Sequence, residues 1–141
     1  NVDKRSSGLI RMTEILGLTD SVTFLGERSD VESFYAALDI ASLSSYGEGF
    51  PNVIGEAMAC CIPCVVTDVG DCRRVVGKTG IVVPAKDPEA LRNGWNRLIN
   101  KGQEERAKLG IAARRRIHEN FEISKVAGQY EELYQKLTIF F

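Results

Sequence analysis

The fold is decided by a stretch that reads DIASLSSYGEGFPNVIGE, at residues 39–56. Its short apolar run, residues 39–43, is typical of a strand, and a turn with two glycines follows it. The pattern from Asn52 to Cys60 then indicates a helix. The first N–H groups of a helix lack partners and carry the positive end of the helix dipole. This strand, turn and helix therefore predict a phosphate-binding site at the helix start.

Two glutamates flank that helix start. Glu48 follows the strand, at the end where open parallel sheets bind ligands. Glu56 lies about one turn inside the helix, ~6 Å along its axis at the usual rise per residue. Carboxylates accept hydrogen bonds from sugar hydroxyls. An anion bound near Asn52 and Val53 would have one carboxylate on either side, and Gly49 would let the backbone approach it closely. A nucleotide diphosphate sugar has this layout, with the diphosphate between the ribose and the transferred sugar.

Spacing alone leaves a second interpretation open. Glu56 could interact only with the helix dipole, and Glu48 could be an ordinary acidic residue of a loop.

Strand and helix patterns alternate along the rest of the chain. Strands are expected at residues 22–26, 40–44, 64–67 and 81–83. Helices are expected at residues 6–18, 31–38, 52–60, 72–76, 88–99, 104–119 and 124–137. Asp87 and Pro88 are typical of a helix start, with aspartate as the cap and proline at the first helical position. The alternation predicts an α/β fold, a Rossmann-like parallel sheet of about four strands flanked by helices, with further helices at the C-terminal end.

The composition excludes several classes of protein. With 141 residues, 44% hydrophobic and 26% charged, the chain has enough apolar residues for one domain. The net charge is only -1, and nucleic-acid binding usually needs a strongly basic surface. No nucleic-acid partner is therefore expected. No apolar run approaches the roughly 18 residues of a membrane span, and the polar start is not a secretory signal. We expect a cytoplasmic protein and, because the first residue is not Met, a piece of a longer one.

The four cysteines, Cys60, Cys61, Cys64 and Cys72, lie too close together for a disulfide framework. Cys61 and Cys64 have the redox spacing, but they follow the C-terminal end of a predicted helix, where the dipole does not lower a thiol pKa. Adjacent cysteines are awkward zinc ligands. We interpret the thiols as reduced and buried, and keep a thiol-based function as the last alternative. The basic run from Arg114 to Arg116 is interpreted as a solvated helix face.

The longer motif EGFPNVIGEAMA, residues 48–59, resembles the paired-glutamate signature of the retaining nucleotide-sugar glycosyltransferases of family four, which have the GT-B fold. Flanking segments fall in that family's order and spacing: FLGERSDV at 24–31, PCVVTDVG at 63–70, TGIVVP at 79–84 and the Asp-Pro pair at 87–88. The likeness covers nearly the whole chain.

The resemblance implies a role for each residue of the motif. Glu48 and Glu56 would be the two catalytic residues, the first contacting hydroxyls of the donor sugar and the second holding the ribose. Arg28 would lie by the base. The other donor-binding residues would line the sugar and the diphosphate: Gly49, Phe50, Pro51, Asn52 and Val53, the last two through their N–H groups. Catalysis would be electrostatic and positional, with no metal and no cofactor.

The resemblance also implies that residues 1–141 are part of a larger site. They would form a partial C-terminal donor-binding domain, half of a GT-B enzyme, without that domain's first two strands and their basic diphosphate ligands. An acceptor-binding N-terminal domain would precede it. The family's strand order, 3-2-1-4-5-6, would leave residues 22–25 without a neighbouring strand, and such an unpaired edge could pair with another copy. The fragment is expected to be inactive alone.

The chain departs from the family at four positions: Ser44 stands where the family has Pro, Cys61 and Asp71 where it has Gly, and Arg74 where it has Glu. An aspartate near a diphosphate adds like charge. We therefore expect weaker donor binding, or a different donor.

The sequence thus predicts a transferase of polysaccharide biosynthesis. It would transfer a sugar, with retention of configuration, from a nucleotide-sugar donor to a sugar or lipid-linked acceptor, in the cytoplasm or at the inner face of a membrane. The alternatives are a nucleotide-sugar epimerase of GT-B architecture and a non-catalytic nucleotide-sugar-binding module. The base, the sugar, the acceptor and the linkage do not follow from the residues.

Overall fold

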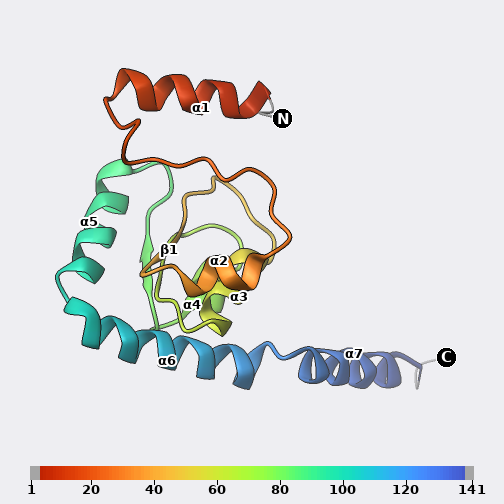
Figure 1. The fold of residues 1–141 in the computed structure, drawn as a ribbon. Coiled ribbons are helices and arrows are strands. Elements are labelled where there is room, and N and C mark those ends of the chain that lie inside the picture. Colours follow the sequence, from red (N-terminus) through yellow and green to blue (C-terminus); the bar gives the residue numbers. More distant parts are fainter. Residues whose placement is uncertain (1–3, 139–141) are drawn as a thin grey trace. The chain divides into compact units, whose positions relative to one another are not determined.

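The computed structural model describes residues 4–138. They form two compact units, of which the first ends at Val31 and the second begins at Glu32. Figure 1 draws both units. The first unit contains α1 (Lys4–Ile15), close to the predicted range. A turn through Gly17 follows it, with φ at +66°. Glycine adopts this left-handed conformation without a steric penalty, so Gly17 can end the helix.

The strand predicted at residues 22–26 is wrong. In this segment no residue pairs with a strand of the described chain, and the side chains of Val22, Phe24 and Leu25 are 36%, 42% and 46% exposed. A β-branched and aromatic run favours an extended backbone, but a strand forms only where a neighbour takes its hydrogen bonds. The sheet of the described residues therefore has three strands, one fewer than the individual strand predictions gave.

The second unit has the predicted α/β fold. Its strands are β1 (Ala41–Leu43), β2 (Cys64–Thr67) and β3 (Ile81–Val83), all parallel and in the order β1-β2-β3. Its helices are α2 (Val31–Ala36, which begins at the boundary), α3 (Asn52–Ala59), α4 (Cys72–Val76), α5 (Pro88–Ile99), α6 (Gly102–Asn120) and α7 (Ile123–Thr138). The Asp87 carboxylate accepts the Ala90 N–H at 2.8 Å and caps α5 as predicted.

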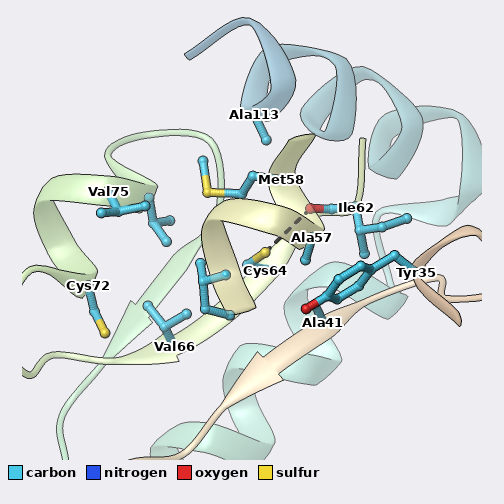
Figure 2. Close-up of a cluster of buried hydrophobic side chains, with 12 residues drawn as sticks. Tyr35, Ala41, Ala57, Met58, Ile62, Cys64, Val66, Cys72, Val75 and Ala113 are labelled. Carbon is cyan, nitrogen blue, oxygen red and sulfur yellow. Dashed lines mark hydrogen bonds between the residues drawn. The ribbon is translucent and has the colours of Figure 1, made fainter. Parts of the chain in front are cut away.

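The sheet is apolar on both faces, as a parallel sheet covered by helices should be. Cys64 and Val66 of β2 face a cluster that contains buried residues of α3, α4 and α6. Figure 2 shows Ala57 and Met58 of α3 lying between the strand and Ala113 of α6. Val65 points to the opposite face and packs with β3 and with Leu98 of α5. All four residues of β2 are buried, so this strand is the centre of the core.

Helix α6 packs closely against the end of α3 because it has a glycine at the contact. A Cβ at Gly110 would lie 1.8 Å from the Cys61 carbonyl oxygen. Cys61 itself has a left-handed backbone, with φ at +63°. This conformation favours glycine, the residue that the family resemblance implies there. The α3–α6 contact thus leaves no room for a side chain at residue 110.

The cysteines are free thiols. Cys64 and Cys72 are buried, as the sequence indicated, whereas Cys60 and Cys61 are only half-buried. Burial raises the pKa of the Cys64 thiol to about 12, so this group stays protonated and unreactive at neutral pH.

One residue of the basic run is not simply solvated. Arg114 and Arg115 are exposed, but Arg116 is half-buried. Its guanidinium donates to the carbonyl of Val75 at 2.8 Å and to that of Arg74 at 2.5 Å. These carbonyls are at the C-terminal end of α4, where a helix lacks internal donors. Arg116 therefore fixes α4 to α6.

Within residues 4–138 we find no helix that is both long enough and apolar enough to cross a membrane.

The close approach of α6 predicts opposite effects for two glycine substitutions. Gly110→Ala should lower the free energy of unfolding by about 2 kcal/mol or more, because its Cβ meets the Cys61 carbonyl. Gly128→Ala in α7, where a Cβ meets nothing within 4 Å, should raise it by about 0.5–1 kcal/mol through helix propensity. Denaturant unfolding measures both, and equal effects would contradict the packing described.

Candidate functional site

The candidate site is built on two loops at the carboxyl edge of the sheet. Residues 44–51, the first loop, follow β1, and residues 68–71, the second loop, follow β2. Gly70 has a left-handed backbone, with φ at +49°, and a Cβ there would lie 2.1 Å from the Glu48 carbonyl oxygen. The Asp71 N–H donates to the Gly49 carbonyl at 3.1 Å. The second loop thus supports the backbone of the first loop directly beneath Glu48 and Gly49.

The Ser45 hydroxyl holds the Glu48 side chain, and a second hydroxyl, that of Thr67, holds the Ser45 backbone. The Ser45 hydroxyl donates to Glu48 Oε1 at 2.5 Å. The Thr67 hydroxyl, on a residue that is only 4% exposed, donates to the Ser45 carbonyl at 2.7 Å. The sequence analysis gave no role to Ser45 or Thr67. A signal for Ser45 was present, since a serine three residues from a carboxylate in a turn can reach it; Thr67 gave none.

The Glu56 side chain is exposed on α3, and Tyr35 contacts it from α2. The Tyr35 hydroxyl lies 3.1 Å from Glu56 Oε2 and 3.1 Å from the Val53 carbonyl oxygen, so it can donate to either. Tyr35 is 7% exposed. Burial, together with the Glu56 carboxylate, raises the pKa of Tyr35 to about 12. The sequence analysis gave no role to Tyr35, although a buried tyrosine hydroxyl needs a partner.

Helix α3 begins at Asn52, the predicted residue. Pro51 precedes it, is buried, and makes no side-chain cap. The Asn52 N–H donates to the Phe50 carbonyl at 3.0 Å, while the Val53 N–H has no acceptor within residues 4–138. In this structure the open donor at the helix start is therefore the Val53 N–H, five residues after Glu48 and three residues, about one turn, before Glu56.

The two glutamates differ in exposure, since Glu48 is half-buried and Glu56 is exposed. A cavity of about 670 Å³ adjoins the first loop, where Phe50, Asp71 and Arg74 line it, and extends along α7 to Tyr130 and Leu133. Neither Glu48 nor Glu56 lines it. No group of three or more His, Cys, Asp or Glu side chains in the described part of the chain is placed to hold a metal ion.

Arg28 lies in the first unit, where it forms an ion pair with Asp30. Its predicted position beside the base of a nucleotide stays a prediction, as do the predicted roles of Glu48, Gly49, Phe50, Pro51, Asn52, Val53 and Glu56. What the structure adds is the hydrogen-bond support that holds the two glutamates.

The comparisons with known proteins define the family. The sequence profile of glycosyl transferases group 1 matches residues 3–101, which include the whole of both loops and α3. The chain therefore belongs to this family of glycosyltransferases. The resemblance found in the motif of residues 48–59 is confirmed.

Relatives and solved structures agree with this assignment. N-acetyl-alpha-D-glucosaminyl L-malate synthase of Bacillus anthracis is 33% identical over 128 residues, which cover 89% of this chain and 33% of the relative. Sucrose-phosphate synthase of Thermosynechococcus elongatus superimposes with a TM-score of 0.85 at 30% identity, covering 96% of this chain and 35% of that one. Anabaena Alr3699/HepE, solved in complex with UDP-glucose, gives a TM-score of 0.84 at 26% identity, covering 95% and 38%. The chain thus spans about a third of the length of these proteins.

The Tyr35 contact predicts an abnormal phenol titration. In the folded protein the pKa of Tyr35 is raised above the ordinary tyrosine value of about 10. The stabilisation that the contact gives is therefore complete below pH ~10 and is lost as the pH rises through about 12. The difference in ultraviolet absorbance between the wild type and Tyr35→Phe should therefore show one phenol that ionises near pH 12. Glu56→Gln should lower that midpoint. A midpoint near 10 in the wild type would contradict the contact.

Proposed function

We propose that the intact protein carrying this chain is a glycosyltransferase that moves a sugar from a nucleotide diphosphate sugar to an acceptor. This chain, residues 1–141, contributes part of the donor-binding domain and lacks the first two strands of that domain. The observation that carries the proposal is the arrangement of Glu48 and Glu56. They flank the open start of α3, and each is held by a hydroxyl group.

Each group at the α3 start suits one part of such a donor. The open Val53 N–H and the positive end of the helix dipole would bind the diphosphate. Glu56, at one side, would accept hydrogen bonds from the ribose, and Glu48, at the other, from hydroxyls of the transferred sugar. Stabilisation of the leaving diphosphate and orientation of the acceptor would then supply most of the rate enhancement, with no metal or cofactor. Transfer would proceed with retention of configuration.

The family assignment and the exposure of Glu56 support a shared site. Glu56 is exposed and Glu48 is half-buried, and the relatives are about three times longer than this chain. An acceptor-binding N-terminal domain would complete the site, so the isolated fragment would be inactive. Since HepE was solved with UDP-glucose, a UDP-sugar is the first donor to test. A sugar or lipid-linked acceptor, cytoplasmic or at the inner face of a membrane, completes the proposal.

Substitution of the two glutamates in the intact protein should affect different kinetic constants. Glu48→Gln keeps the size of the side chain but removes a charged acceptor for the transferred sugar, and should lower kcat by about a hundredfold. Glu56→Gln should raise the donor KM about tenfold, because the ribose loses a charge-assisted hydrogen bond. Glu132→Gln, exposed on α7, is the matched control and should change neither constant.

The assay uses a panel of UDP-, GDP- and ADP-sugars and follows the anomeric configuration of the product. An unchanged kcat in Glu48→Gln would refute the role of Glu48. Interconversion of the donor without an acceptor would favour an epimerase, and donor binding without turnover would favour a non-catalytic binding protein.

A further inference from the structure

Asp71, at the end of the second loop, forms a forked ion pair with Arg74 of α4. Arg74 Nε lies 3.2 Å from Asp71 Oδ1, and Nη2 lies 2.7 Å from Oδ2. The guanidinium holds the pKa of the Asp71 carboxyl below its ordinary value. The same Asp71 donates its backbone N–H to the Gly49 carbonyl at 3.1 Å. One residue thus contacts both the first loop and Arg74, and the Arg74 guanidinium offsets the like charge that Asp71 alone would add near a diphosphate.

Arg74 is also connected to the first loop through two aromatic side chains. Its guanidinium carbon lies 5.3 Å from the centre of the Phe121 ring. The Phe121 ring centre lies 5.6 Å from that of Phe50, in a tilted arrangement. Phe50 in turn covers the first turn of α3, with its Cε1 atom 3.7 Å from the position of a Cβ at Gly55. These contacts connect Asp71 to the helix start through Arg74, Phe121 and Phe50.

Phe121 is fixed from a second side. The Arg116 guanidinium carbon lies 5.9 Å from the ring centre, and Arg116 is itself bound to the carbonyls of Arg74 and Val75. The ring therefore has a guanidinium from α4 and one from α6 beside it, an arrangement that favours one ring position. A fixed Phe121 limits the positions open to Phe50.

We propose that Asp71 and Arg74 are a positioning pair for the nucleotide-sugar donor, which holds residues 48–52 through the Gly49 carbonyl on one side and through Phe121 and Phe50 on the other. The proposal rests on the proposed function. The pair contacts the loop that leads into the start of α3, not the donor itself. It deepens that function by naming residues outside the glutamate motif that set the shape of the site.

A neighbouring ion pair provides a matched comparison. Arg73 of α4 also forms a forked pair, with both Asp68 carboxylate oxygens 3.0 Å from its Nε. The side chains of the two pairs are similarly exposed, 67% and 38% for Arg73 and Asp68 against 61% and 41% for Arg74 and Asp71. Within residues 4–138, Arg73 contacts no aromatic ring. Exposed ion pairs add little to stability, so a difference between the two pairs would report positioning.

The experiment measures the Kd of UDP, with GDP and ADP as alternative probes, by calorimetry on the intact protein. Arg74→Lys keeps the charge but loses the fork and the flat stacking surface, and Asp71→Asn loses the charge at constant size. Each should weaken binding about fivefold. The double variant should also weaken it about fivefold rather than about twenty-fivefold, because both changes break one unit. Arg73→Lys and Asp68→Asn should change Kd less than twofold.

Thermal unfolding of every variant accompanies the titrations and should show similar Tm values for the two pairs. Wild-type binding in the Asp71 and Arg74 variants would overturn the proposal. So would additive losses, or equal losses in the Arg73 and Asp68 variants. If the wild type itself binds none of the three nucleotides, the proposed function fails, and the positioning role fails with it. Titration of the wild type alone therefore separates failure of the proposed function from failure of the positioning role.

Discussion

The contact between Gly70 and the Glu48 carbonyl is the constraint on which the candidate site depends. The two loops follow neighbouring strands whose register, Leu43 opposite Val66, brings their ends to the same edge. The second loop can approach the first because Gly70 has no side chain and its φ is +49°. A Cβ at this residue would lie only 2.1 Å from the Glu48 carbonyl oxygen. The Glu48 backbone is thereby fixed against β2, the most buried strand of the sheet.

Core residues also hold the site's side chains. Thr67 ends the central strand and Tyr35 packs in the core cluster, yet the hydroxyl of each reaches the candidate site. Ile54, Ala57 and Met58 bury one face of α3 against the sheet and α6, and this burial leaves Glu56 on the opposite, exposed side. The same packing that stabilises α3 therefore sets where its open start and its glutamate lie.

Local patterns predicted much of this structure from the sequence. The start of α3, the bounds of β2, β3 and α4, and the Asp87 cap all follow from short-range signals such as apolar runs, prolines and capping residues. The strand at residues 22–26 was mispredicted because pairing depends on a neighbour, not on the run itself. The supports from Thr67, Tyr35 and Arg116 join segments far apart in the sequence, so no local pattern shows them. The contact of Phe121 with Phe50 also joins distant segments and has no local pattern. Asp71 and Arg74 were visible in the sequence as departures from the family, but their role was not.

The most direct test is nucleotide binding by Gly70→Ala in the intact protein, with Gly102→Ala as control. Both glycines have left-handed backbones, with φ at +49° and +76°, but a Cβ at Gly102 meets nothing within 4 Å. The two variants therefore share the backbone strain and differ in the contact with Glu48. Circular dichroism verifies that each is folded. We predict that Gly70→Ala loses at least tenfold in affinity for UDP while Gly102→Ala keeps wild-type affinity. Wild-type affinity in a folded Gly70→Ala protein would contradict the account.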